Sequence, residues 1–414
     1  MITGLDIICI SSIEWDFLWQ GHQEINLRLA KAGNRVLYIE NTGVRSPAVR
    51  DAWRIKTRLK NWVRSWPSHG FREVAPNFYV CSTPVLPPFG PLWQRHVNRR
   101  LILPGIRRIA RRLGMEDTLL WTYLPTNTAV DLINLLRTPR SLTIYYCIAD
   151  FAQLTPHVQS LRQSEETLVR LSDVVFAQEP SLAAHCARWN DNVHIFPFGV
   201  NLNAFPLEDN HGSNAALDET TQRRAAFLQA FPKPVIGYIG GLHGHVDFGM
   251  LLAMARARPN WSWLFVGAVQ TAVGDLAELP NVYLVGQQEH RDLVRYIRLF
   301  DVCIVPYVNS HFTSTVVPTK INEYLAVGKP VVSSRLPAVC EFNNEHNILQ
   351  TASTEPADFL NAIEVALTLP NDEATIARRR AVAELGNWDS RLEAMSQVIE
   401  TELRARDSRA KKQR

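Results

Sequence analysis

Long apolar runs, clustered cysteines and a strong excess of one charge are all missing from this sequence of 414 residues. No stretch of about 18 uncharged apolar residues occurs, so we predict that no segment spans a membrane. Residues 1–10 contain Asp6 and no basic residue, which is not the pattern of a signal peptide. The net charge of +4 is mild. These absences favour a cytoplasmic globular protein.

The cysteines form no recognisable framework for a disulfide or a metal. The six cysteines are scattered without a C-x-x-C pair, and Cys9, Cys147 and Cys303 lie in apolar, strand-like runs. Such residues in a cytoplasmic protein are expected to be reduced thiols. We therefore predict that they are core or surface thiols with no disulfide or metal-binding role.

The chain is too long for a single hydrophobic core, so two domains are expected. Apolar strand-like runs alternate with amphipathic helical runs in both halves, which is typical of α/β proteins with doubly wound parallel sheets. We predict domains over 1–205 and 233–385, joined by a polar linker over 206–232. An amphipathic helix over 386–405, expected to return to the first domain, precedes a basic tail over 406–414.

The first turn between a strand and a helix lacks the glycine pattern of dinucleotide-binding proteins. In place of G-x-G-x-x-G it carries Trp15, Trp19 and a single glycine, Gly21. Aromatic side chains of this size prevent a close approach of pyrophosphate to the backbone, so we reject a dinucleotide site here. Gly21 leaves room for a different substrate at the start of the helix.

Two segments combine basic residues with tryptophan. Residues 50–66 hold six arginines and lysines against the single acid Asp51, and residues 93–112 hold Trp93 and seven arginines. This pattern suits an anionic membrane surface or, less well, nucleic acid. It also suits solvated helices whose arginine stems cover apolar surface. We predict a membrane surface and no nucleic acid as partner, with solvated helices as the alternative.

Residues 316–334 read as a short helix followed by a buried strand. Pro318 or Thr319 begins the helix, and Gly328 ends it where a positive φ is needed. The charged pair Lys320 and Glu323 has two interpretations. It is either a solvated ion pair at i,i+3 or a clamp in which Lys320 shares a phosphate with backbone amides and Glu323 accepts from ribose hydroxyls.

Two further positions are candidates for ligand binding. A strand from residue 235 is followed by a turn that contains Gly240, Gly241, His243 and His245, an order that suits phosphate binding. The histidines either reach a phosphate or face water. Asp150 follows a strand over 141–148, so it lies either in the ligand crevice of an open sheet or at a helix cap.

Several of these segments together resemble one family. Residues 318–332 read Pro-Thr-Lys-Ile-Asn-Glu-Tyr-Leu-Ala-Val-Gly-Lys-Pro-Val-Val. They are preceded in order by Phe198-Gly199-Val200-Asn201, by Gly240-Gly241 with Asp247, and by Asp301 with Pro306. In this arrangement the chain resembles a GT-B glycosyltransferase of the family 4, or glycosyl transferases group 1, type. The tryptophan-rich start also resembles a subgroup of transferases of cell-surface polysaccharide assembly.

The resemblance implies two Rossmann-like domains facing across a cleft, a nucleotide-sugar donor on the second domain, an acceptor on the first, and retention of anomeric configuration. In it, Glu323 is the second glutamate of an E-x7-E motif and holds the donor ribose, Lys320 lies near the diphosphate, and the nucleobase lies near 286–291. The implied donor-binding residues are Gly240, Gly241, His243, His245, Thr315, Val316, Lys320 and Glu323. The implied catalytic residues are Asp150, Lys320 and Glu323, and the implied acceptor-binding residues are Trp19 and Gly21.

The sequence departs from the family pattern at three points. Thr315 stands where the first glutamate of E-x7-E is expected, and the basic residues that usually neutralise the diphosphate fall near Gly241 and His245. A neutral imidazole is a poorer counter-charge than arginine or lysine. The histidine of the family's first domain has no clear counterpart, and Asp150 is the nearest candidate.

These features predict a metal-independent enzyme without a cofactor, since no D-x-D pair stands where a metal would bridge phosphates. The acceptor would be lipid-linked or a polysaccharide at the inner face of the cytoplasmic membrane. Two other hypotheses stay open. One is a catalytically silent GT-B scaffold or partner subunit, and the other is a GT-B sugar-nucleotide epimerase.

Overall fold

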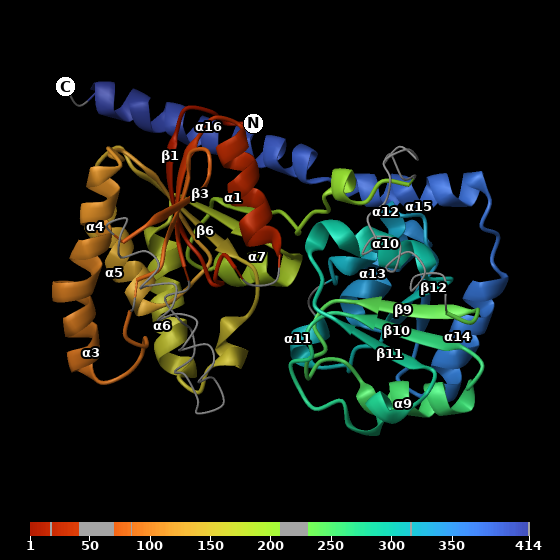
Figure 1. Cartoon of the computed structure of the whole chain (residues 1–414). Coiled ribbons are helices and arrows are strands. Elements are labelled where there is room, and N and C mark those ends of the chain that lie inside the picture. The colour runs from red at the N-terminus through yellow and green to blue at the C-terminus, as the bar shows by residue number, and fades with distance from the viewer. Residues whose placement is uncertain (17–18, 41–69, 84, 208–230, 315–316, 413–414) are drawn as a thin grey trace, which may run out of the picture. The chain divides into compact units, whose positions relative to one another are not determined.

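The computed structural model describes residues 1–16, 19–40, 70–83, 85–207, 231–314 and 317–412. The chain divides into two compact units (Figure 1), of which unit 1 comprises Met1–Pro197 with Asp389–Arg414 and unit 2 comprises Phe198–Trp388. The first unit therefore closes before residue 205. The reason is that Val200 and Phe205 are buried in the core of unit 2, where the Val200 N–H donates to the Gly386 carbonyl.

Unit 1 is built on an eight-stranded sheet with the order β3-β4-β2-β1-β5-β6-β7-β8. All neighbouring pairs are parallel except β3 and β4, which form an antiparallel hairpin at the edge of the sheet. The sequence pattern did not indicate this hairpin. The central strands are buried on both faces, as their continuous apolar runs predicted. The strands are β1 (Asp6–Ile10), β2 (Arg35–Ile39), β3 (Arg72–Ala75), β4 (Phe78–Cys81), β5 (Leu119–Thr122), β6 (Leu142–Cys147), β7 (Val174–Ala177) and β8 (Val193–Ile195).

The helices of unit 1 connect these strands. A run of α3, a π-helical segment η2 and α4 lies along one side of the unit, where α4 packs on α5 (Figure 1). None of the helices in the described ranges is long and apolar enough to cross a bilayer. The helical segments are α1 (Gly21–Lys31), α3 (Leu92–Val97), η2 (Asn98–Ile102), α4 (Leu103–Arg112), α5 (Asn127–Leu136), η3 (Phe151–Leu154), α6 (Val158–Leu171), α7 (Pro180–Cys186) and α16 (Trp388–Lys412).

The C-terminal helix α16 is fastened to unit 1. The Ile2 N–H donates to Ser396 Oγ at 3.0 Å, and Asn192 Nδ2 donates to Glu402 Oε1 at 2.9 Å. Arg406 Nη2 reaches Asp173 Oδ1 at 2.6 Å. The helix continues to Lys412, beyond the predicted limit at residue 405, and Arg406 of this extension makes the ion pair with Asp173.

Unit 2 is built on a six-stranded sheet with the order β11-β10-β9-β12-β13-β14, in which all pairs are parallel. Its strands are β9 (Val235–Ile239), β10 (Ser262–Val266), β11 (Val282–Gly286), β12 (Val302–Val305), β13 (Val331–Ser334) and β14 (Gln350–Ala352). Its helical segments are η4 (Leu202–Ala204), α9 (Phe248–Ala257), η5 (Gly274–Glu278), η6 (His290–Asp292), α10 (Leu293–Leu299), α11 (His311–Ser314), α12 (Lys320–Ala326), α13 (Pro337–His346), α14 (Pro356–Thr368) and α15 (Glu373–Leu385).

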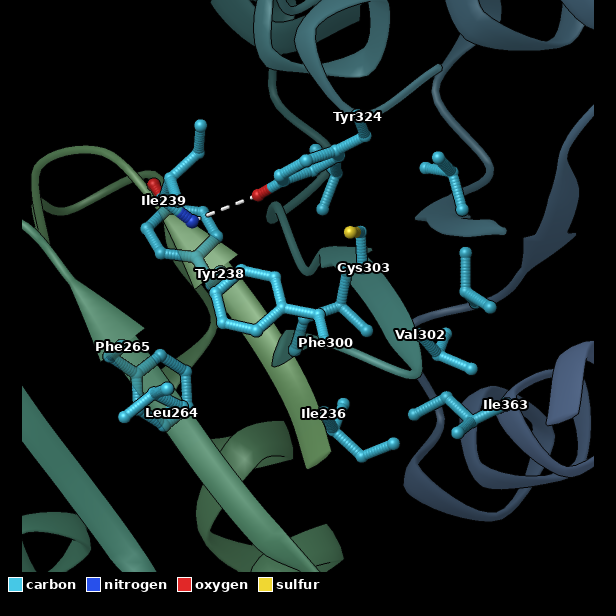
Figure 2. Packing of buried hydrophobic residues seen from close by; sticks show 14 of the residues in the cluster. Ile236, Tyr238, Ile239, Leu264, Phe265, Phe300, Val302, Cys303, Tyr324 and Ile363 are labelled. Atoms are coloured by element: carbon cyan, nitrogen blue, oxygen red, sulfur yellow. Dashed lines mark hydrogen bonds between the residues drawn. The ribbon is translucent and has the colours of Figure 1, made fainter. Parts of the chain in front are cut away.

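A glycine in the middle of β9 sets how closely the core of unit 2 packs. A Cβ atom placed on Gly237 would lie within 2.2 Å of three ring atoms of Phe300. Figure 2 shows Phe300 beside Tyr238 and Cys303, with the ring inside the cluster. The ring thus occupies the space that any side chain at Gly237 would need.

Replacing Gly237 with alanine is expected to destabilise unit 2 by about 1–3 kcal/mol, because the added methyl group must displace a buried ring. Urea unfolding followed by tryptophan fluorescence measures the loss. Gly244→Ala is the matched control, since a Cβ at Gly244 meets nothing within 4 Å. Equal unfolding midpoints for the two variants would contradict the prediction.

Candidate functional site

The helix α12 has the local structure that its sequence predicted. Thr319 is the N-cap, and the helix runs from Lys320 to Ala326. Tyr324 and Leu325 are fully buried, and Gly328 has φ +76°, the left-handed conformation that ends the helix. The helix therefore presents its apolar side to the sheet and carries Lys320 in its first turn.

A buried hydrogen bond fixes α12 to the end of β9. Strand β12 pairs with β9 only at Ile236 and Gly237, so the Ile239 N–H lies beyond that ladder. The Tyr324 hydroxyl accepts this N–H at 2.9 Å (Figure 2). One side chain of the helix thus replaces the missing strand partner and sets the position of Lys320 relative to the turn after β9.

Lys320 is a buried cation held by two phenols. Its Nζ donates to Tyr238 Oη at 2.8 Å and to Tyr307 Oη at 2.6 Å. The same atom lies 4.0 Å from the centre of the Tyr238 ring and 4.8 Å from that of the Tyr307 ring. No carboxylate of the described residues lies within ion-pair distance of it. The solvated pair with Glu323 is therefore excluded, because Lys320 is only 9% exposed and bound elsewhere.

The glycine turn after β9 lies against this ammonium group. Gly240 has φ +118°, and a Cβ placed on it would lie 2.8 Å from Lys320 Nζ. The Gly241 carbonyl accepts from the Tyr238 hydroxyl at 3.0 Å, and a Cβ at Gly241 would lie 2.8 Å from Gln270 Nε2. The structure thus brings Gly240, Gly241 and Lys320 together. It adds Gln270, which no sequence pattern indicated.

The two histidines of the turn form a pair beside the same site. The rings of His243 and His245 are 5.1 Å apart, and His243 lies 5.8 Å from the ring of Tyr307. Burial, then the positive charges of Lys320 and His245, lower the pKa of His243 to about 4. His243 is therefore neutral at pH 7.

Glu323 faces a different neighbour. His290 Nε2 lies 3.5 Å from Glu323 Oε1, and the His290 ring packs edge-on against Phe205 at 5.3 Å. His290 falls in the range 286–291, which the resemblance placed near the nucleobase. The sequence carried no signal that it would contact Glu323.

In unit 1, the Asp150 carboxylate accepts hydrogen bonds from neighbouring residues. It caps η3, with Oδ1 accepting from the Ala152 N–H and Oδ2 accepting from Gln153 Nε2 at 3.1 Å and Arg162 Nη2 at 2.9 Å. Burial acts to raise the pKa of Asp150, but these hydrogen bonds and the Arg162 charge outweigh it and leave that pKa below its usual value. The contacts are those of the helix-cap alternative.

Of the remaining predicted site residues, some lie within the described residues and some lie outside them. Trp19 Nε1 donates to Glu24 Oε2 at 2.7 Å, and Gly21 is the buried first residue of α1. Thr315 and Val316 lie outside the described residues, as does the basic segment over 50–66.

Comparisons with known proteins agree with this geometry. Residues 233–368 match the family described as glycosyl transferases group 1. Over 168 residues the chain is 33% identical to a Bacillus subtilis (strain 168) protein described as "Putative teichuronic acid biosynthesis glycosyltransferase TuaH". That match covers 40% of this chain and 42% of the relative, so the chain aligns with less than half of that protein's length.

Two solved structures are similar over almost the whole chain. Sucrose-phosphate synthase from Thermosynechococcus elongatus has a TM-score of 0.69 at 17% identity, covering 97% of this chain and 100% of that one. HepE from Anabaena, solved with UDP and glucose, has a TM-score of 0.61 at 15% identity, covering 95% and 99%. At these identities the likeness shows the fold, which is the GT-B fold of two α/β units. The chain therefore has the GT-B fold, and its residues 233–368 match the glycosyl transferases group 1 family.

Tyr324→Phe is expected to lower the stability of unit 2 by about 1–3 kcal/mol, because it leaves the buried Ile239 N–H without an acceptor. Thermal unfolding measures the change. Tyr283→Phe is the control, since it removes a half-buried hydroxyl that has no hydrogen-bond partner among the described residues. If both variants had the melting temperature of the wild type, the prediction that this hydrogen bond stabilises unit 2 would be wrong.

Proposed function

We propose that this chain is a retaining glycosyltransferase that takes a sugar from a nucleotide-sugar donor bound to unit 2. One observation carries the proposal: a buried ammonium group, Lys320, has phenol partners but no carboxylate in the described structure, and it lies at a glycine turn. A buried charge is costly unless it is paired. A diphosphate at the turn would supply the missing negative charge.

The chemistry of sugar transfer needs this charge. As the bond between the anomeric carbon and the diphosphate breaks, negative charge grows on the leaving group while the sugar becomes oxocarbenium-like. A preorganised cation that touches the leaving group stabilises that state more than the ground state. Lys320 would take this role, and the backbone amides of Gly240 and Gly241 would donate to the phosphates. We propose that no metal ion is needed.

Glu323 would orient the nucleoside. Its carboxylate is partly exposed and has no strong ion pair, because the only described neighbour at ion-pair distance is His290 at 3.5 Å. It is therefore able to accept hydrogen bonds from ribose hydroxyls. In the family pattern a first glutamate contacts the donor sugar. Thr315 stands at that position here, so another group must make this contact.

Calorimetry with a panel of UDP-, GDP- and TDP-sugars tests the donor site. Wild type is expected to bind at least one of them, with EDTA making no difference to binding or turnover. Lys320→Met is expected to weaken binding roughly 10- to 100-fold, the loss for a hydrogen bond to a charged group. Glu323→Ala should weaken binding and abolish turnover, whereas Glu341→Ala, on the exposed side of α13, should do neither.

The panel also separates the rival functions. If no nucleotide sugar binds, the chain is a silent GT-B scaffold. If a donor is converted to its epimer without any acceptor, the chain is an epimerase. Wild-type turnover in Glu323→Ala would remove the assignment of that residue. The anomeric configuration of the product, read by NMR, decides between retention and inversion.

We further propose a lipid-linked or polysaccharide acceptor reached at an anionic membrane surface. The supporting feature is the outer side of the run α3–η2–α4, where Leu92, Trp93 and Leu101 are 86%, 59% and 73% exposed. The arginines along the run differ in whether they form ion pairs. Arg95 makes a two-bonded ion pair with the buried Asp131 of α5 and fastens the run to the unit. The exposed arginines without an ion pair to a described residue are Arg100, Arg107, Arg108, Arg111 and Arg112.

Exposed apolar side chains among unpaired arginines fit the interface of anionic lipids, where each basic residue contributes about 1 kcal/mol. We expect the protein to co-sediment with vesicles of phosphatidylglycerol and phosphatidylcholine at low salt, but not with phosphatidylcholine alone. The double variant Arg107→Glu, Arg108→Glu should lose most of this binding. A double charge reversal in unit 2, Arg256→Glu with Arg335→Glu, is the matched control. Equal binding to both vesicle types would rule out the anionic surface.

A further inference from the structure

One ring nitrogen in the glycine turn has its proton position fixed by the backbone. His243 Nδ1 accepts a hydrogen bond from the His245 N–H at 3.3 Å. A nitrogen that accepts cannot carry the proton, so a neutral His243 holds its proton on Nε2. No side chain of the described residues is hydrogen-bonded to Nε2, and the ring is half-buried. Nε2 can therefore donate to a bound ligand.

Burial and the nearest charged groups oppose a positive charge on His243, and together they outweigh a backbone hydrogen bond that favours it. Lys320 of α12 and His245 of the same turn act on it as cations, and the rings of Tyr307 and His245 pack beside it. No carboxylate of the described residues appears among the groups that influence it. Burial and these charges hold the pKa of His243 at about 4. Protonation would also place a hydrogen on Nδ1 and break the bond from the His245 N–H.

We propose that His243 binds the diphosphate of the donor as a neutral Nε2–H hydrogen-bond donor and not as a second cation. The inference rests on the proposed function and deepens it, because it states how the site works where the family pattern has a basic residue. Lys320 is then the fixed cation at the donor diphosphate, and His243 contributes a neutral hydrogen-bond donor beside it.

This assignment sets the contribution of His243 to the pH dependence of donor binding. A histidine that stays neutral takes up no proton when the ligand binds, so His243 contributes no change in donor affinity from pH 8 to about pH 5.5. If His243 instead became protonated on binding, donor affinity would rise as the pH falls from 8 to about 5.5. A nucleotide sugar is the right probe because its diphosphate diester has no ionisation there, unlike a free nucleoside diphosphate.

The experiment is calorimetry of the full chain at pH 6.0 in two buffers of different ionisation enthalpy, with the nucleotide sugar that binds tightest in the panel. Equal apparent enthalpies are expected, which means no proton uptake. His243→Ala should weaken binding about tenfold or more. His243→Asn should restore most of that loss, because its amide donates without charge. His346→Asn, on α13, is the control histidine.

Each outcome decides a separate point. Uptake of one proton that disappears in His243→Asn would overturn the neutral-donor assignment, and so would wild-type affinity in His243→Ala. A His243→Asn variant as weak as His243→Ala, with an unchanged melting temperature, would do the same. Absence of binding by every nucleotide sugar is different, since it overturns the proposed function together with this inference.

Discussion

The ammonium group of Lys320 is the constraint on which the rest of unit 2 depends. It is buried without a described carboxylate and is held by the hydroxyls and ring faces of Tyr238 and Tyr307. Phenol oxygens offset part of the cost of burying a charge, and cation–π contacts add roughly 0.5–2 kcal/mol. Both partners come from other elements, β9 and the segment after β12. The cation therefore exists in this position only if strand, loop and helix meet at one point.

Several features of unit 2 hold the strand, the loop and the helix together around Lys320. The Tyr324 hydroxyl binds the last N–H of β9, which fixes the helix that carries Lys320. Gly240 has no side chain, so the turn passes the ammonium group without a clash. All of these groups lie at the carboxyl end of β9 and β12, which is where open α/β sheets bind their ligands. The contacts that stabilise unit 2 are thus the same ones to which we propose that the donor binds.

Unit 1 has a similar sheet, but the polar residues near its strand ends are bonded to other residues of the unit. Glu40, at the end of β2, accepts from Ser82 and from the Trp15 N–H, and burial raises its pKa despite these bonds. His22 bonds to Ser12 at 2.8 Å, and burial lowers its pKa to about 3. Asp150 is occupied by a cap and an ion pair. These groups hold the loops of unit 1 in place, whereas the run α3–η2–α4 carries exposed arginines that have no ion pair to a described residue.

The sequence by itself determined the local structure: the apolar strands, the span of α12, the stop at Gly328 and the resemblance to GT-B proteins all follow from periodicity, turn residues and a short motif. It also placed Lys320 and Glu323 on one helix, but it left open whether they pair. Only the tertiary structure decided that, because the phenol of Tyr238 lies 82 residues away in the chain. The same holds for Gln270 beside Gly241 and for His290 beside Glu323. Local periodicity shows which face of an element is buried, whereas the partner on that face depends on how distant segments pack.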